Sequence, residues 1–177
     1  FKSEIEYFGA SNFEMVRSSL ELTKLDLSNY SSIFIGGGNT YKLLKELQSN
    51  SNIEKIKKYL LDGGIVYGGS AGAIIFGKDI DGCILMDDKL EVNTNGFNLI
   101  NGYSLLCHYN KNSLNQNKSY LKEYSNKNKL LFLPEEVVLV VTDKKIKFIG
   151  EKKYCLFING DYSIHSSANF KKDINHE

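Results

Sequence analysis

Two glycine-rich turns constrain the fold of this chain more than any other sequence feature. The first turn, residues 36–38, follows the short apolar run 32–35, and the second turn, residues 68–72, follows the apolar run 65–67. A segment with helical spacing begins directly after each turn. Because strand, turn and helix repeat in this order, the sequence predicts an α/β fold with parallel strands and helices on both faces of the sheet.

The second half of the chain has a different pattern. Short apolar runs alternate there with polar turns, and residues 143–144 and 159–160 suit hairpins, the Asn-Gly pair at 159–160 more strongly. We therefore expect antiparallel strands toward the C-terminus to complete a mostly parallel central sheet. Helices are expected at 14–22, 40–47, 53–61 and 71–76. Strands are expected at 25–27, 32–35, 65–67, 103–107, 130–133, 137–142, 145–149 and 154–158.

Composition excludes several classes of protein. The chain has 177 residues, 42% of them hydrophobic, which predicts one domain over residues 1–177 with its own core. A net charge of +1 leaves no electrostatic footprint for nucleic acid, and no apolar run approaches the ~20 residues that span a bilayer. Residues 1–5 lack the apolar stretch of a signal peptide. The three cysteines match no metal or redox spacing, so we expect no metal and a reducing, cytoplasmic compartment.

The second glycine-rich turn carries a candidate nucleophile. Residues 68–72 fit the pattern G-x-S-x-G, in which a serine projects from a sharp strand-to-helix turn, here as Ser70. Glycines two residues before and after the serine let the backbone turn and let the helix pack closely. The N-terminus of that helix also places positive partial charge beside a developing anion. A glycine-rich turn without chemistry is the alternative, but the flanking strand and helix favour a nucleophile.

The first glycine-rich turn suggests an oxyanion hole. Turns that follow neighbouring parallel strands face one crevice at the carboxyl edge of a sheet. The backbone N–H of Gly38 could therefore meet that of Ala71, the residue after the nucleophile. A phosphate or dinucleotide loop is not favoured, because neither glycine-loop pattern for such cofactors is present. A purely structural loop stays open as the alternative.

A serine nucleophile needs a base, and the chain has three histidines. His176 is next to the last residue, and His165 lies in a polar tail. His108 follows the apolar run 103–107, which places it near the end of a strand, where a catalytic base belongs. We therefore favour His108, although a lone histidine is more often structural.

A carboxylate must orient that histidine. Glu135 and Glu136 lie at a break between two apolar runs, and adjacent residues on a strand would point to opposite faces, so only one of them could reach the base. Asp87 and Asp88 are alternative orienting acids, and a solvated corner is the plain reading of the Pro-Glu-Glu turn.

Four sequence blocks together resemble the peptidase E family, the S51 class of α-aspartyl dipeptidases, with cyanophycinase as a distant relative. The match covers roughly residues 20–160, with the blocks in family order. The blocks are Gly36-Gly37-Gly38-Asn39-Thr40 with Leu43-Leu44, Gly69-Ser70-Ala71-Gly72-Ala73, His108-Tyr109-Asn110 and Leu133-Pro134-Glu135. The resemblance implies a flavodoxin-like three-layer α/β sandwich related to class I glutamine amidotransferases. It also implies a triad of serine, histidine and carboxylate.

Carried over to this chain, the resemblance implies Ser70 as nucleophile, His108 as base and Glu135 as orienting acid. Gly38 and Ala71 correspond to the oxyanion pair.

Three further residues are implied as substrate contacts: Asn39, Asp88 and Asn110. Asp88 resembles a family acid near the site, where it could touch the amino end of a substrate or replace Glu135.

The chain departs from the family pattern in three places. The strand and helix that usually precede the position of Phe1 are missing, and Gly69 occupies a position where a large residue is common. The arginine that reads the substrate carboxylate after the histidine block is also absent; Lys111, Lys118 and Lys122 are the nearest cations. Since lysine lacks the bidentate fork of arginine, we expect a weak preference for an N-terminal Asp.

Two functions stay open on the sequence alone. The favoured one is a serine peptidase that hydrolyses short peptides, dipeptides among them, through an acyl-enzyme. The alternative is a catalytically weak or inactive relative that binds a small ligand or a protein partner. The sequence leaves the oligomeric state open, a homodimer included, and indicates no cofactor, nucleic-acid or membrane partner.

Overall fold

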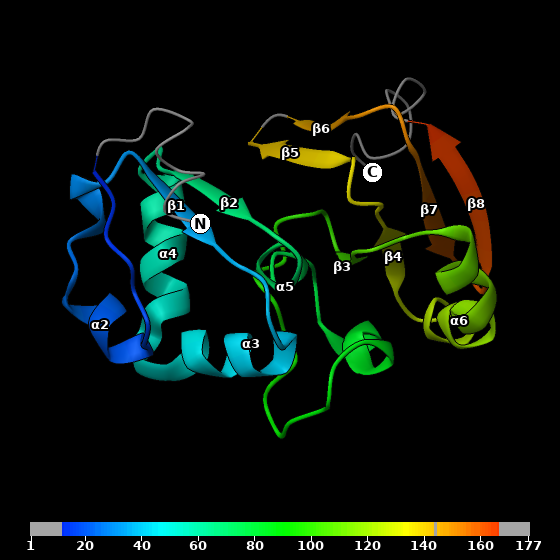
Figure 1. The fold of residues 1–177 in the computed structure, drawn as a ribbon, viewed down its shortest axis with the longest axis horizontal. Coiled ribbons are helices and arrows are strands. Elements are labelled where there is room, and N and C mark those ends of the chain that lie inside the picture. The colour runs from blue at the N-terminus through cyan, green and yellow to red at the C-terminus, as the bar shows by residue number, and fades with distance from the viewer. Residues whose placement is uncertain (1–11, 144, 167–177) are drawn as a thin grey trace.

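The computed structural model describes residues 12–143 and 145–166 (Figure 1). His176 and Lys144, the latter part of one expected hairpin, lie outside the described residues.

The first half of the chain builds a two-stranded parallel sheet. Strand β1 pairs with β2, with Ser32 opposite Ile65 and Ile35 opposite Gly68. Its elements are α2 (Ser19–Lys24), β1 (Ser32–Ile35), α3 (Thr40–Gln48), α4 (Asn52–Leu61) and β2 (Ile65–Gly68). Helices α3 and α4 bury their apolar residues in one cluster with Ile35 of β1. Asn39 caps α3, since its side-chain oxygen accepts a hydrogen bond from the Lys42 N–H.

The second half builds a four-stranded mixed sheet in the order β3-β4-β7-β8. Strands β3 and β4 are parallel, and the pairs β4–β7 and β7–β8 are antiparallel. The elements are β3 (Tyr103–Leu106), α6 (Lys111–Tyr124), β4 (Lys129–Phe132), β7 (Lys153–Ile158) and β8 (Asp161–Ser166). The Asn159–Gly160 turn joins β7 to β8, and both residues have positive φ, as a two-residue hairpin requires.

Strands β5 (Val138–Thr142) and β6 (Lys145–Ile149) form a separate antiparallel hairpin. Helix α5 (Ala71–Ile74) lies between the two larger sheets and contacts both β2 and β3 (Figure 1). One buried cluster contains Ile35 from β1, Ile74 from α5 and Phe132 from β4, so the two sheets share a core.

The sheet arrangement differs from the sequence prediction. The predicted single, mostly parallel sheet is replaced, among the described residues, by three separately hydrogen-bonded sheets, and two of their five strand pairings are parallel. Strands β2 and β3 belong to different sheets, and helix α5 contacts both of them. The antiparallel pairing expected toward the C-terminus is confirmed.

Two elements near the N-terminus also differ. The helix expected at 14–22 begins only at Ser19, because the Ser18 side chain caps it by accepting from the Glu21 N–H. The strand expected at 25–27 is wrong. A short 3₁₀ helix follows instead at Leu27–Asn29, since the Asp26 carboxylate accepts from the Ser28 N–H and turns the chain.

One α-helix and one strand of the described residues are absent from the sequence prediction. Helix α6 is polar and buries only Leu114 and Leu121, which is too little for a clear helical stripe. Strand β8 carries His165, so this histidine lies in a strand and not in a polar tail. No helix in the described part of the chain is long and apolar enough to cross a bilayer.

Candidate active site

Ser70 occupies a strained strand-to-helix turn. It follows β2 directly and precedes α5, as the G-x-S-x-G pattern predicts. Its backbone has φ +52° and ψ −116°, a region that residues other than glycine rarely adopt. Such a conformation costs on the order of 1–3 kcal/mol and persists only where surrounding contacts hold it.

The surrounding glycines permit the close approach that holds this turn. A Cβ on Gly72 would lie 2.0 Å from the carbonyl oxygen of Ile35, and one on Gly68 would lie 2.3 Å from that of Gly72. A Cβ on Gly37 would lie 3.2 Å from the Cβ of Ser70. The two glycine-rich turns therefore face each other, as expected for neighbouring parallel strands.

The Ser70, His108 and Glu135 side chains form a continuous row of hydrogen bonds. The Oγ of Ser70 lies 2.9 Å from Nε2 of His108, and Nδ1 of His108 lies 3.0 Å from Oε1 of Glu135. The His108 side chain is 45% exposed and that of Glu135 is 77% exposed. The predicted proximity of the three groups is confirmed, and the row lies open to water at its acidic end.

Of the two neighbouring glutamates, the one that contacts His108 is Glu135. Glu135 and Glu136 lie in a turn between β4 and β5, not in a strand as the sequence argument assumed. Glu135 reaches His108, and Glu136 lies 3.9 Å from the Nζ of Lys152. A Cβ on Gly150 would lie 2.2 Å from the carbonyl oxygen of Glu136, so the β6–β7 connection packs directly against this turn.

The histidine and the acid come from neighbouring strands whose ends are fastened together. The N–H of Tyr109 donates to the carbonyl of Leu133 at 2.9 Å, and the N–H of Leu133 donates to that of Leu106 at 2.9 Å. Behind the nucleophile, the thiol of Cys107 donates to the Ser70 carbonyl at 3.8 Å. These hydrogen bonds therefore link the segment that carries His108 to the segments that carry Glu135 and Ser70.

The two predicted oxyanion donors start from suitable positions. The N–H of Ala71 opens α5, and Gly38 has φ +135°, which favours glycine. Within residues 12–143 and 145–166, neither N–H donates to a protein acceptor. Their role at a substrate oxygen stays a prediction.

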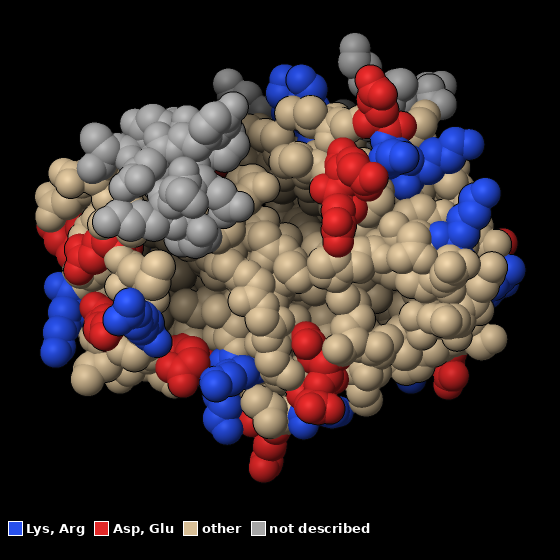
Figure 2. Space-filling model, in the orientation of Figure 1, with Lys and Arg blue, Asp and Glu red and all other residues tan. Residues whose placement is uncertain are grey.

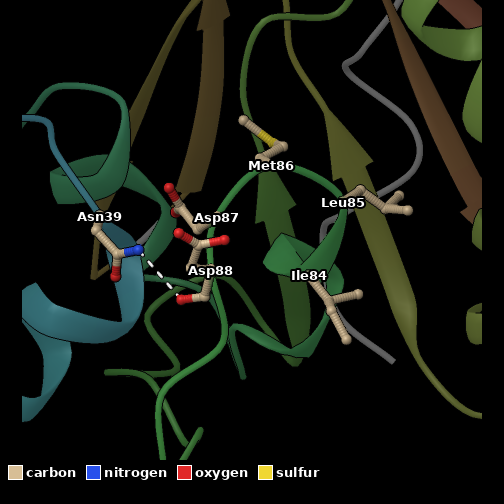
Figure 3. A pocket seen from close by; sticks show the side chains of 6 residues that line it. All are labelled: Asn39, Ile84, Leu85, Met86, Asp87 and Asp88. Atoms are coloured by element: carbon tan, nitrogen blue, oxygen red, sulfur yellow. Dashed lines mark hydrogen bonds between the residues drawn. The ribbon is translucent and has the colours of Figure 1, made fainter.

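Asn39 and Asp88 lie together at a pocket of about 370 Å³ (Figure 3). The Asn39 amide donates to the Asp88 carbonyl at 3.2 Å while its oxygen caps α3. The Asp87 carboxylate accepts from the Thr40 N–H at 2.9 Å, so it is not the orienting acid. The exposed Asp88 carboxylate has no partner among the described residues. The pocket is lined by Asn39, Ile84, Leu85, Met86, Asp87 and Asp88.

Asn110 serves as the N-cap of α6. Its side-chain oxygen accepts from the Ser113 N–H at 2.9 Å, and its amide donates to the His108 carbonyl at 3.3 Å. The contact of Asn110 with a substrate stays a prediction. In the structure, both polar atoms of its side chain form hydrogen bonds within the chain. The Asn-x-x-Ser pattern at 110–113 was the sequence signal for this cap and for the start of α6.

Two of the three candidate cations on α6 face β8. The Nζ of Lys118 lies 4.6 Å from the centroid of the Tyr162 ring, and the Nζ of Lys122 lies 3.1 Å from Asp161. Lys111, the first residue of α6, is exposed and three positions after His108. Of these lysines, Lys111 is the one available near the base.

The described part of the chain contains no group of His, Cys, Asp and Glu arranged to hold a metal ion. Burial raises the pKa of Cys107 to about 12, so this thiol beside Ser70 is protonated near neutral pH. Uncharged side chains occupy the hollowed centre of the face in Figure 2, with acidic side chains above and below it.

The sequence model of peptidase family S51 matches residues 5–149. This chain belongs to peptidase family S51.

Two curated relatives of this S51 chain are similar over most of its length. An uncharacterized peptidase of Listeria monocytogenes, Lmo0363, is 28% identical over 128 residues, which are 70% of this chain and 62% of the relative. Peptidase E of Nostoc sp. PCC 7120 is 26% identical over 168 residues, 88% of this chain and 67% of the relative. The chain thus spans about two thirds of the length of these relatives.

Two solved structures share the fold. A protein of Listeria monocytogenes EGD-e, provisionally assigned as a peptidase E, has a TM-score of 0.68 at 23% identity, covering 85% of this chain and 76% of its own. A peptidase from an acI-B1 actinobacterium has a TM-score of 0.60 at 19% identity, covering 78% and 58%. At these identities the likeness establishes a mixed α/β fold of the peptidase E type.

Proposed function

We propose that this S51 family member is a serine peptidase that hydrolyses short peptides through Ser70, His108 and Glu135. The observation that carries the proposal is the row of hydrogen bonds from the Ser70 hydroxyl through His108 to Glu135, at 2.9 Å and 3.0 Å. A nucleophile, a base and an orienting acid are the groups that acyl transfer requires.

In the proposed reaction, the Ser70 Oγ attacks the scissile carbonyl carbon while His108 Nε2 accepts the hydroxyl proton. The N–H groups of Gly38 and Ala71 donate to the oxyanion that forms. The intermediate collapses as His108 gives the proton to the leaving amine, which leaves an ester at Ser70. A water molecule, deprotonated by His108, then attacks the ester, and Ser70 recovers its proton as the acid product leaves. Glu135 holds the ring and stabilises its charged form.

Asp88 supports an exopeptidase role within this proposal. Its exposed carboxylate at the rim of the pocket, next to Asn39, is suited to bind the α-ammonium group of a peptide. Lys111 is the cation left to meet a substrate carboxylate. As a flexible point charge it discriminates less sharply than arginine, by about two powers of ten if one charged contact of 2–3 kcal/mol is lost.

Covalent labelling tests the proposed nucleophile. A fluorophosphonate probe should label the wild-type protein at Ser70, identified by peptide mass spectrometry, and should not label Ser70→Ala. Absence of labelling at Ser70 in the folded wild type would reject the serine peptidase.

Hydrolysis of dipeptides tests the substrate preference. Asp-Leu should be cleaved no more than about a hundredfold faster than Ala-Leu, Ser-Leu or Gly-Leu. A preference of about a thousandfold or more, equal to about 4 kcal/mol, would mean that another group reads the carboxylate.

A ligand-binding relative without catalysis is the second candidate. The exposed Phe34 and Tyr67 rings on the small sheet, stacked with centroids 5.4 Å apart, are the observation that favours a binding surface. This function is preferred if the folded protein neither labels at Ser70 nor cleaves dipeptides.

A further inference from the structure

His108 adopts a backbone conformation that is uncommon for residues other than glycine. Its φ is +64°, in the left-handed region, where a bulky side chain crowds the backbone. The residue lies between the end of β3 at Leu106 and the N-cap of α6 at Asn110, so the chain must reverse within a few residues. Such a conformation needs contacts that hold it in place.

The capping box of α6 supplies these contacts. The Asn110 amide donates to the His108 carbonyl at 3.3 Å, and the Ser113 Oγ lies 3.3 Å from the same oxygen. The Ser113 hydroxyl also lies 2.9 Å from the Asn110 carbonyl, so its proton is shared between the two acceptors. In return, the Asn110 N–H donates to Ser113 Oγ at 2.9 Å, and the Asn110 oxygen accepts from the Ser113 N–H.

The far end of α6 is anchored as well. The Tyr124 hydroxyl donates to Oδ1 of Asp79 at 2.5 Å and lies 2.8 Å from the Ser104 Oγ in β3. Because the buried end of the helix is fixed to the strand that precedes His108, its N-terminal cap is a firm support rather than a fraying end.

We propose that Asn110 and Ser113 are positioning residues for the base. By donating to the His108 carbonyl, they hold the left-handed backbone that directs Nε2 toward Ser70 and Nδ1 toward Glu135. The catalytic consequence rests on the proposed serine peptidase function, but the geometric claim does not. Asn110 thereby acts through His108 and not through contact with substrate.

Substitution by aspartate separates positioning from helix capping. Asn110→Asp keeps an oxygen that accepts from the Ser113 N–H, and aspartate is as good an N-cap as asparagine, but the donor to His108 is lost. Fluorophosphonate labelling should slow by about tenfold or more, since small misplacements of reacting groups are costly. The melting temperature should stay equal to that of the wild type or rise.

Uncharged and distant variants serve as controls. Ser113→Ala removes the second donor without adding charge and should also slow labelling, and Ser113→Thr should restore the rate. Ser18→Ala removes the cap of α2, where the side chain accepts from the Glu21 N–H. It should lower the melting temperature while labelling at the wild-type rate.

Proton NMR gives a readout independent of turnover. The Nδ1–H of His108, hydrogen-bonded to Glu135, should give a downfield resonance in the wild type that broadens or disappears in the Asn110→Asp, Ser113→Ala double variant. A double variant with the wild-type labelling rate and an unchanged resonance would overturn the positioning role. If the wild type itself fails to label at Ser70, the peptidase proposal fails, while the resonance comparison still decides the positioning role.

Discussion

The two larger sheets differ in burial, and each contributes a different part of the same site. Strands β1 and β2 carry the glycine-rich turns and Ser70, yet one face of their sheet is half exposed, with Phe34 47% and Tyr67 53% exposed. Strand β3, which leads to His108, is buried along its whole length, and β4, which leads to Glu135, is buried at three of its four residues.

Parallel sheets are normally covered on both faces, so a half-exposed face is unusual for the small sheet. The contacts that support this sheet are the close backbone approach of its glycines, above all Gly72 to Ile35, and its packing with α3, α4 and α5. The comparison teaches that the nucleophile is held by backbone contact at a turn, whereas the base and the acid are held by a buried sheet and a helix cap.

Removing the nucleophile should have the largest effect. Ser70→Ala should lower dipeptide hydrolysis by ~10⁴-fold or more, measured as kcat/KM, with little change in the denaturation midpoint. Ser163→Ala is a matched control, because Ser163 also contacts a histidine, His165, at 2.6 Å, but lies on β8 rather than on an elbow. Equal losses in the two variants would remove Ser70 from its role.

Truncating one apolar residue in each sheet tests their difference in burial. Leu131 in β4 is fully buried, so Leu131→Ala should cost about 3 kcal/mol in the free energy of unfolding. Phe34→Ala should cost about 1 kcal/mol, because half of that side chain already meets water. Urea denaturation measures both values. A larger cost at Phe34 would mean that this half-exposed face is more fully covered in solution.

Neutralising the orienting acid should have an intermediate effect on rate. Glu135→Gln should lower kcat by about a hundredfold, at the small end for acid–base catalysis, because the exposed carboxylate is screened by water. Glu136→Gln changes the same group one residue away, beside Lys152, and should leave kcat within a factor of about two. Similar losses in both would point to general electrostatics instead of an oriented histidine.

Thiol labelling should reveal the smallest difference between the regions. Burial raises the pKa of Cys83, before β3, and of Cys155, in β7, to about 12. Both thiols are therefore protonated and unreactive at pH 8 until the chain opens and their pKa returns to about 8.5. We expect Cys83, in a 3₁₀ segment, to react with a thiol reagent before Cys155, which lies within a sheet. If Cys155 reacted before Cys83, the 3₁₀ segment that carries Cys83 would be more stable to local opening than the sheet that carries Cys155.

The raised pKa values of the buried thiols also make the free energy of unfolding depend on pH. Since the folded pKa of each buried thiol is raised, the folded chain holds these protons more tightly than the unfolded chain. The free energy of unfolding should be insensitive to these thiols below about pH 8 and fall as the pH rises toward 12, by up to about 1.4 kcal/mol per pH unit for each thiol. Replacing Cys83 by Ala should reduce that slope, measured by denaturation between pH 7.5 and 10.

Local patterns were enough to locate the parts of the site that lie on one short segment. The elbow around Ser70, the facing turn at Gly37 and the hairpin at 159–160 each depend on glycine in a conformation or close approach that other residues resist. His108 followed from its place after an apolar run, and Glu135 from the family resemblance. Short stretches of sequence were enough to name these positions, although the contacts that hold the elbow come from another segment, as between Gly72 and Ile35.

The tertiary structure decided what depends on residues far apart. The Ser70–His108 contact spans 38 positions and the His108–Glu135 contact spans 27. Whether α5 contacts both β2 and β3, and whether Lys118 faces β8 or the base, depends on packing between elements and not on spacing within one. Helix α6 was not predicted from the sequence because it has no clear apolar stripe. The cap at Asn110 and the hydrogen bond of Tyr124 stabilise it instead. The spacing of apolar residues along a segment indicates which of its faces is buried. Which segments contact one another depends instead on the free energy of the whole packed core.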